Sequence, residues 1–143
     1  METAANKEAR PRSLSRRGLP GLRILVAEDN LLEADFVQRM LLDAGHEVVG
    51  PVARVVEALY LARQADIDGA LLDINLAGRN SFAVAWCLED RHLPFAFITA
   101  YPRSYLPGAG GLRSVPVIAK PVSEQDVLDI VASFATSAPG RHP

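Results

Sequence analysis

The chain has 143 residues, of which 49% are hydrophobic, so it is long enough to form one domain around a buried core. Its formal net charge of −2 gives no general attraction to nucleic acid, so direct nucleic-acid binding is not expected. No apolar run approaches the roughly 18 residues of a membrane-spanning helix, and we therefore expect a cytoplasmic protein that does not bind membranes.

Charge is distributed unevenly along the chain. Residues 1–20 contain five basic and two acidic residues, a net charge of +3, which leaves −5 for the remainder. We predict a disordered basic N-terminal extension over residues 1–20, one folded domain over 21–136 and a loose C-terminal tail over 137–143. The single cysteine, Cys87, excludes an internal disulfide, and its apolar surroundings predict a buried structural thiol.

Short apolar runs alternate with segments of helical periodicity. In chain order the predicted elements are a strand over Arg23–Ala27, a helix over Leu31–Ala44, a strand over Val48–Ala53, a helix with Val55, Ala58, Leu59 and Ala62 on its apolar face, a strand over Gly69–Ile74, a helix over Ser81–Asp90, a strand over Pro94–Ala100, a short strand over Pro116–Ala119, and a helix that begins at Ser123 and frays after Ala135. This alternation predicts an α/β fold in which right-handed crossovers join five parallel strands into a doubly wound sheet, with helices on both faces.

Local signals set several element ends. Asn30 can cap the first helix, with Glu33 three residues later as in a capping box, and Pro51 suggests that the second strand lies at an edge of the sheet. The alternation requires a fourth helix within Pro102–Val115, but this segment is rich in proline and glycine. We predict that the fourth helix is short or irregular and that this segment is the part that moves.

Polar side chains stand at the carboxyl ends of four predicted strands. Because ligands bind where these ends meet in an open parallel sheet, we expect the side chains to lie close together. They are Glu28 and Asp29 after the first strand, Asp73 at the third, Thr99 at the fourth and Lys120 after the fifth. Crowded carboxylates repel one another unless a hard cation neutralises them, which predicts an Mg²⁺ site. Asp29 and Asp73 are the expected direct ligands, Glu28 contributes directly or through a water, and the backbone carbonyl of Asn75 can complete the site.

An aspartate beside magnesium can attack an activated phosphoryl group and form an aspartyl phosphate. Asp73 is the predicted acceptor. Lys120 can pair with one phosphoryl oxygen, and the Thr99 hydroxyl can donate a hydrogen bond to another. The added charge of about −1.5 to −2 then reorganises whatever these two residues contact.

Four segments of the chain resemble the receiver domains of two-component response regulators. They are Ile24–Asn30, Leu71–Asn75, Ile98–Ala100 and Ala119–Pro121, and they occur in this order with suitable spacing. The resemblance implies the flavodoxin-like strand order 2-1-3-4-5 and a cis peptide bond at Lys120–Pro121. It further implies that Asp73 accepts phosphate from a sensor histidine kinase or a histidine phosphotransfer protein, with magnesium bound by the Glu28–Asp29 pair. Such a protein is a signalling protein rather than an enzyme, although it promotes its own phosphotransfer and dephosphorylation.

The segment Phe97–Tyr101 resembles the Phe-Ala-Thr-Gly-hydrophobic-Tyr class of alphaproteobacterial receivers, which are often single-domain and served by HWE-type kinases. Ala100 replaces the glycine of that class, and Val117 occupies the position of the usual switch aromatic. Tyr101 is therefore the candidate switch aromatic beside Thr99. We expect a single-domain regulator, monomeric or weakly homodimeric, that acts on an unknown downstream protein or serves as a phosphate sink.

Three other functions fit the residues less well. An aspartyl phosphatase needs an Asp-x-Asp pair after the first strand, which Glu28–Asn30 does not supply. A flavin carrier needs a first loop rich in hydroxyl groups and glycine, and the acidic pair would repel its phosphate. A receiver that no longer takes phosphate is disfavoured because Asp73, Thr99 and Lys120 are all present.

Overall fold

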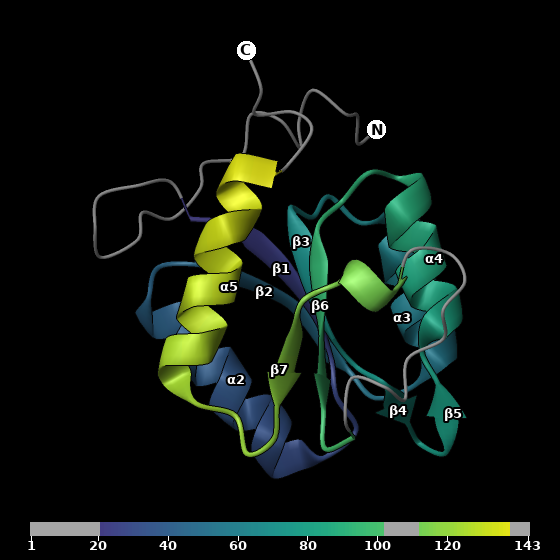
Figure 1. Ribbon diagram of the computed structural model, residues 1–143, viewed down its shortest axis with the longest axis horizontal. Helices are drawn as coiled ribbons and strands as arrows, with labels where there is room; N and C mark the ends of the chain where they lie inside the picture. The colour runs from purple at the N-terminus through teal and green to yellow at the C-terminus, as the bar shows by residue number, and fades with distance from the viewer. Residues whose placement is uncertain (1–20, 102–111, 138–143) are drawn as a thin grey trace, which may run out of the picture.

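A computed structural model describes residues 21–101 and 112–137 of the chain. The elements, labelled as in Figure 1, are β1 (Arg23–Ala27), α2 (Leu31–Asp43), β2 (Glu47–Val52), α3 (Val55–Gln64), β3 (Gly69–Asp73), β4 (Asn75–Leu76), β5 (Arg79–Asn80), α4 (Phe82–Asp90), β6 (Phe95–Thr99), the 3-10 helix η2 (Leu112–Ser114), β7 (Val117–Ala119) and α5 (Glu124–Ser137). The predicted basic extension over residues 1–20 and residues 138–143 of the predicted tail lie outside the described residues.

Five strands form one parallel sheet in the order β2-β1-β3-β6-β7. Counted along the chain, this is the predicted order 2-1-3-4-5, so the flavodoxin-like, doubly wound fold is confirmed. β2 lies at an edge of the sheet, as Pro51 suggested. Gly50, just before that proline, has a φ of +101°, and a Cβ there would lie 2.9 Å from the Val52 nitrogen, so this position requires glycine.

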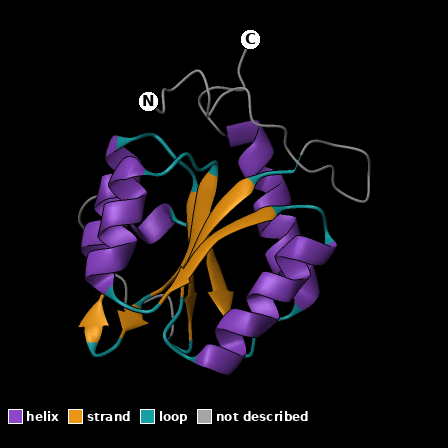
Figure 2. Ribbon diagram, turned by 180° about the vertical axis from the view of Figure 1, so that it is seen from behind, coloured by secondary structure: helices purple, strands orange, loops and turns teal. Residues whose placement is uncertain are grey.

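Helices cover both faces of the sheet, as Figures 1 and 2 show from opposite sides. α2 and α5 pack on one face through Val37, Met40, Leu41, Val127, Val131 and Phe134. α3 and α4 pack on the other through Ala58, Ala62, Val84, Ala85 and Leu88. β1, β3 and β6 are buried along their whole length between these layers. The polar residues that follow these strands are therefore held on a rigid support.

The cap of α2 differs in one respect from the predicted capping box. Asn30 Oδ1 accepts a hydrogen bond from the backbone N–H of Glu33, at 3.0 Å, as predicted. The Asn30 backbone N–H donates to Glu28 instead, and the Glu33 carboxylate pairs with Lys120. The reciprocal half of the predicted box is therefore wrong, because Lys120 offers Glu33 an opposite charge.

A small antiparallel hairpin, absent from the sequence prediction, follows β3. β4 pairs with β5 through a two-residue turn in which Ala77 and Gly78 both have positive φ, 51° and 87°. This turn matches the twist of a hairpin, and Asn75 Oδ1 tightens it by accepting from the Gly78 backbone N–H, at 3.0 Å. The hairpin lies at the carboxyl end of the sheet (Figure 1).

Three aromatic contacts run from β6 to the surface of α4. The ring of Phe97 lies 6.0 Å from that of Phe82 and 5.8 Å from that of Phe95, edge to face in both cases. Phe82 in turn lies 6.1 Å from Trp86, which is 42% exposed. Cys87, predicted to be buried, is half-buried and packs against this core.

The predicted mobile segment over Pro102–Val115 is described only at its end. Residues 102–111 lie outside the described residues, and the described end of the segment contains the 3-10 helix η2. The last helix continues to Ser137, beyond the predicted end at Ala135. No helix in the described ranges is long and apolar enough to cross a membrane.

Candidate functional site

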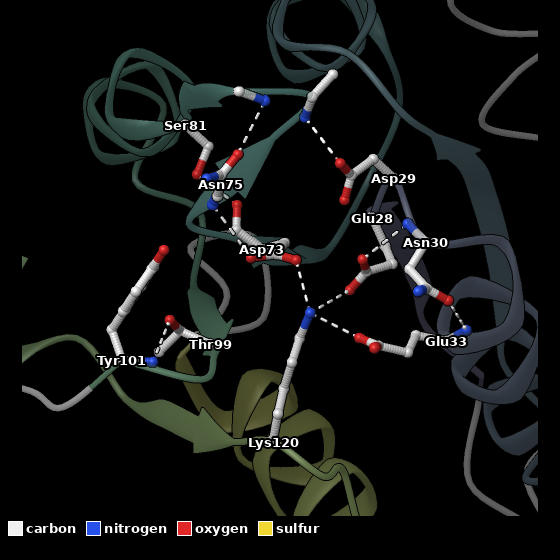
Figure 3. A network of polar contacts seen from close by, with 12 residues as sticks. Glu28, Asp29, Asn30, Glu33, Asp73, Asn75, Ser81, Thr99, Tyr101 and Lys120 are labelled. Atoms are coloured by element: carbon white, nitrogen blue, oxygen red, sulfur yellow. Dashed lines mark hydrogen bonds and ion pairs between the residues drawn. The ribbon is translucent and has the colours of Figure 1, made fainter.

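Three carboxylates converge at the carboxyl end of the sheet. One oxygen each from Glu28, Asp29 and Asp73 lies within 4.8 Å of the others. Glu28 and Asp73 are buried, whereas Asp29 is exposed. The structure thus brings together the three side chains that were predicted as metal ligands, from the ends of β1 and β3 (Figure 3).

Lys120, which follows β7, extends into this cluster. Its Nζ donates to Asp73 Oδ2 at 2.7 Å and lies 3.3 Å from Glu28 Oε1 and 2.6 Å from Glu33 Oε1 (Figure 3). The Lys120 backbone N–H donates to the Thr99 carbonyl, at 3.0 Å, which fixes the base of the side chain to β6. The peptide bond from Lys120 to Pro121 is cis, as the family resemblance implied.

Backbone groups around the cluster orient its carboxylates. The Asn75 N–H donates to Asp73 Oδ1 at 3.1 Å, and the Asn30 N–H donates to Glu28 Oε2 at 3.0 Å. The buried Ser81 hydroxyl donates to the Asp73 carbonyl at 2.7 Å. The Glu28 and Asp73 carboxylates are therefore each held by the turn that follows their own strand, and the Asp73 backbone is held additionally by Ser81, just before α4.

Asp29 differs from Glu28 and Asp73 because its carboxylate contacts the β4–β5 hairpin. Its Oδ2 accepts a hydrogen bond from the Ala77 backbone N–H, at 2.9 Å. One carboxylate of the candidate metal site thus binds the β4–β5 turn directly.

Thr99 and Tyr101 are joined through the backbone. Thr99 is buried at the end of β6, and its Oγ1 accepts a hydrogen bond from the Tyr101 N–H, at 2.9 Å. The Tyr101 side chain is 43% exposed and runs to one side of the carboxylate cluster (Figure 3). The two predicted switch residues are therefore adjacent, and their switch role stays a prediction.

Burial and charge shift two pKa values at the site. Burial raises the pKa of Glu28 from 4.5 to about 7, with a further contribution from the charge of Asp73, although the hydrogen bond from Asn30 and the charge of Lys120 oppose it. Burial alone would lower the pKa of Lys120, but hydrogen bonds to Asp73 and Glu33 outweigh it and raise this pKa. Lys120 thus remains charged, while Glu28 is poised to gain or lose a proton.

The donor set fits a magnesium ion. Magnesium prefers a few hard oxygen ligands and retains several waters, and one exposed and two buried carboxylates offer such a set at one point. Burial is the main cause of the raised pKa of Glu28, and a cation there would relieve the smaller contribution from the charge of Asp73. The residues present therefore match the predicted metal.

Known proteins share this fold and much of this sequence. No protein-family model matches the chain. It is 34% identical over 114 residues to the phyllosphere-induced regulator PhyR of Methylorubrum extorquens. It is 32% identical to SdrG of Sphingomonas melonis, with a TM-score of 0.70 over 80% of this chain and 96% of SdrG. A response regulator receiver protein from Sinorhizobium medicae matches with a TM-score of 0.71 at 23% identity, over 82% of this chain and 96% of that one. The chain belongs to the response regulator receiver family.

Further comparisons bear on the extent and the metal of this receiver. The match to PhyR covers 76% of the receiver chain and 42% of PhyR, and a match to PdtaR of Mycobacterium tuberculosis covers 54% of PdtaR. The receiver thus spans about half the length of the curated relatives it matches. The receiver domain of the Pseudomonas aeruginosa sensor histidine kinase PA1611 has a magnesium ion coordinated in its active-site cleft. It is 23% identical, with a TM-score of 0.66 over 82% of this chain and 99% of that one.

Sequence reasoning missed three contacts of this receiver's site. Glu33 was placed in a helix cap and contacts Lys120 instead. Ala77 was given no role, and Ser81 was seen only as the start of a helix, yet they bind Asp29 and Asp73. A signal existed for Glu33 alone, because α2 begins at the carboxyl end of the sheet and its first turn must face the site.

The affinity of the receiver for Mg²⁺ is expected to rise with pH. With a Glu28 pKa of about 7, the metal must displace a proton at pH 6 but not at pH 8, so affinity should fall about tenfold between pH 8 and pH 6. In the metal-free protein, the folded state binds the extra proton, so the free energy of unfolding should decrease as pH rises from 4.5 to about 7. Magnesium titrations at several pH values check this, and a Glu28→Gln variant with the same pH dependence would contradict it.

Proposed function

We propose that the chain accepts a phosphoryl group on Asp73 from the phosphohistidine of a histidine kinase or a phosphotransfer protein, in a magnesium-dependent reaction. The observation that carries this proposal is the position of Asp73. Its carboxylate lies within the three-carboxylate cluster and also accepts a 2.7 Å hydrogen bond from Lys120. An acceptor needs both a metal site and a cation for the phosphoryl oxygens, and Asp73 is beside both.

The proposed chemistry uses the free electron pairs of the Asp73 carboxylate. One oxygen attacks phosphorus, the phosphorus–nitrogen bond of the donor breaks, and the electron pair returns to the imidazole, which is then protonated. Magnesium would be held by Glu28, Asp29, Asp73 and the carbonyl of Asn75. It would neutralise charge on the transferring oxygens. Lys120 would bind one phosphoryl oxygen, and the Thr99 hydroxyl would donate a hydrogen bond to another.

We propose that the signal leaves the site through Thr99. Its Oγ1 accepts a hydrogen bond from the Tyr101 backbone N–H, while its O–H remains available to donate to a phosphoryl oxygen, so a shift of Thr99 toward that oxygen would be passed to the Tyr101 backbone. Residues 102–115, which follow directly, are the proposed moving part. The outcome would be altered binding of a downstream protein, or removal of phosphate from a pathway as a sink. The single-domain organisation, the cytoplasmic location, the HWE-type donor and the monomeric or weakly dimeric state stay predictions.

Apolar side chains beside the site offer a contact surface for a protein donor. Leu31 and Leu32 are 82% and 83% exposed at the start of α2, and Phe36 is 47% exposed one turn later. Leu32 and Phe36 also line a groove of about 220 Å³ whose other wall is Pro121 and Val122. A donor that covers this surface would bring its histidine to the carboxyl end of the sheet.

Leu32→Asp is expected to slow phosphotransfer from a donor protein while leaving labelling by a small acyl phosphate unchanged. The side chain is exposed, so its replacement leaves the core intact, but a charge would be desolvated in the proposed contact. Transfer rates from a phosphorylated histidine protein, measured beside acyl phosphate labelling, check this. Equal transfer rates from the protein donor to wild type and to Leu32→Asp would contradict the proposed surface.

The proposed function is tested by intact mass after incubation with a small acyl phosphate. A gain of one phosphoryl group is expected with Mg²⁺, and none after chelation of the metal. No gain in any condition would favour a receiver that no longer takes phosphate.

A further inference from the structure

The ammonium group of Lys120 is surrounded by carboxylates before any phosphoryl group arrives. Its Nζ donates a hydrogen bond to Asp73 at 2.7 Å and forms ion pairs with Glu33 at 2.6 Å and Glu28 at 3.3 Å. A phosphoryl oxygen that pairs with Lys120 must therefore compete with one of these carboxylates. The ease with which the phosphorylated state forms depends on which carboxylate is displaced from Lys120.

Glu33 is the partner best placed to be displaced. Asp73 is the proposed acceptor, and Glu28 is 3% exposed and accepts a second hydrogen bond from Asn30. The Glu33 side chain is 40% exposed, so water can solvate it at little cost once it leaves Lys120. Glu33 is also not part of the three-carboxylate cluster, so it is not among the candidate metal ligands.

We propose that Glu33 is a positioning residue that holds Lys120 in the resting state and competes with the phosphoryl group for it. This inference rests on the proposed function. Glu33 Oε1 is bound to the same nitrogen that would pair with the phosphoryl oxygen, and its negative charge faces the site that must accept another anion (Figure 3). Glu33 thereby opposes the phosphorylated state and favours the return of Lys120 to its resting position.

The test measures binding of beryllofluoride, an anion that mimics the phosphoryl group, in the presence of Mg²⁺. Glu33→Gln is expected to bind it about two- to fivefold more tightly, the range given by a partly exposed ion pair. Magnesium alone should bind equally or more weakly, because the variant has lost a nearby negative charge. A general disturbance of the fold would weaken both steps, so tighter beryllofluoride binding without tighter magnesium binding distinguishes positioning from structural damage.

Asp35→Asn is the matched control. Asp35 lies on the same helix and pairs with Arg39 at 2.9 Å, so its replacement removes an equal charge without touching Lys120. Equal tightening in this control, or none in Glu33→Gln, would overturn the inference. So would persistence of the full effect in a Lys120→Gln background, since Glu33 is inferred to act through Lys120.

Glu33→Asp provides a second variant. It keeps the charge but shortens the reach to Lys120, and an affinity between those of wild type and Glu33→Gln is expected. Affinity above that of Glu33→Gln would contradict the role of charge. If wild type bound no beryllofluoride with magnesium present, the proposed function would fail. If wild type bound it and the Glu33 variants bound it with the same affinity, only the role of Glu33 would fail.

Discussion

An Asp73→Asn chain is expected to gain no phosphoryl group from an acyl phosphate, under conditions in which the wild-type chain gains one. The amide has no negatively charged oxygen to attack phosphorus, and it removes one of the three converging carboxylates. Both the nucleophile and part of the metal site are lost, so the loss should be complete rather than partial. Intact mass with Mg²⁺ present is the measurement.

Asp129→Asn controls for the loss of one carboxylate. Asp129 is exposed on α5, where it accepts a hydrogen bond from Gln125. This variant should be labelled as fully as wild type. Labelling of Asp73→Asn at the wild-type level would show that another residue is the acceptor, and would remove the observation on which the proposed function rests.

Leu25→Ala is expected to lower the free energy of unfolding by about 3–5 kcal/mol, as for other fully buried leucines. Leu25 is 0% exposed in β1, between β2 and β3, so its truncation leaves a cavity that the flanking strands cannot close. Since small domains are stable by about 5–15 kcal/mol, the change removes a large share of the total. Denaturant unfolding followed by circular dichroism measures it.

Leu31→Ala is the matched control because it makes the same chemical change at a side chain that is 82% exposed. The expected loss is below about 0.5 kcal/mol, as for most surface substitutions. Similar losses for the two variants would mean that β1 is not the buried centre of the sheet.

The fold followed from the sequence because burial leaves a strong pattern. The strands of the sheet are short apolar runs, and a parallel sheet buried on both faces permits few topologies for such an alternation. Pro51 even indicated an edge strand. The β4–β5 hairpin was missed because its strands have two residues each and its turn places Ala77, rather than glycine or asparagine, at positive φ.

The site followed from the sequence only as far as strand ends determine it. Glu28, Asp29, Asp73, Thr99 and Lys120 meet because parallel strands deliver their ends to one place. The contacts of these side chains could not be predicted from the sequence. Whether the Glu33 carboxylate binds its helix cap or Lys120 depends on a distance of a few ångströms between segments that are far apart in the chain. Sequence patterns record which residues share a face, but not which of two acceptors a lysine reaches.

The aromatic contacts beneath α4 give the molecule an optical property. Trp86 is the chain's one tryptophan, and its ring is linked through Phe82 to Phe97, which lies two residues before Thr99 on β6. An indole that is 42% exposed emits according to its local surroundings. The protein thus carries an intrinsic fluorophore, two ring contacts from the strand that ends at Thr99. We expect a change at Thr99 to be detectable by tryptophan emission without an added dye.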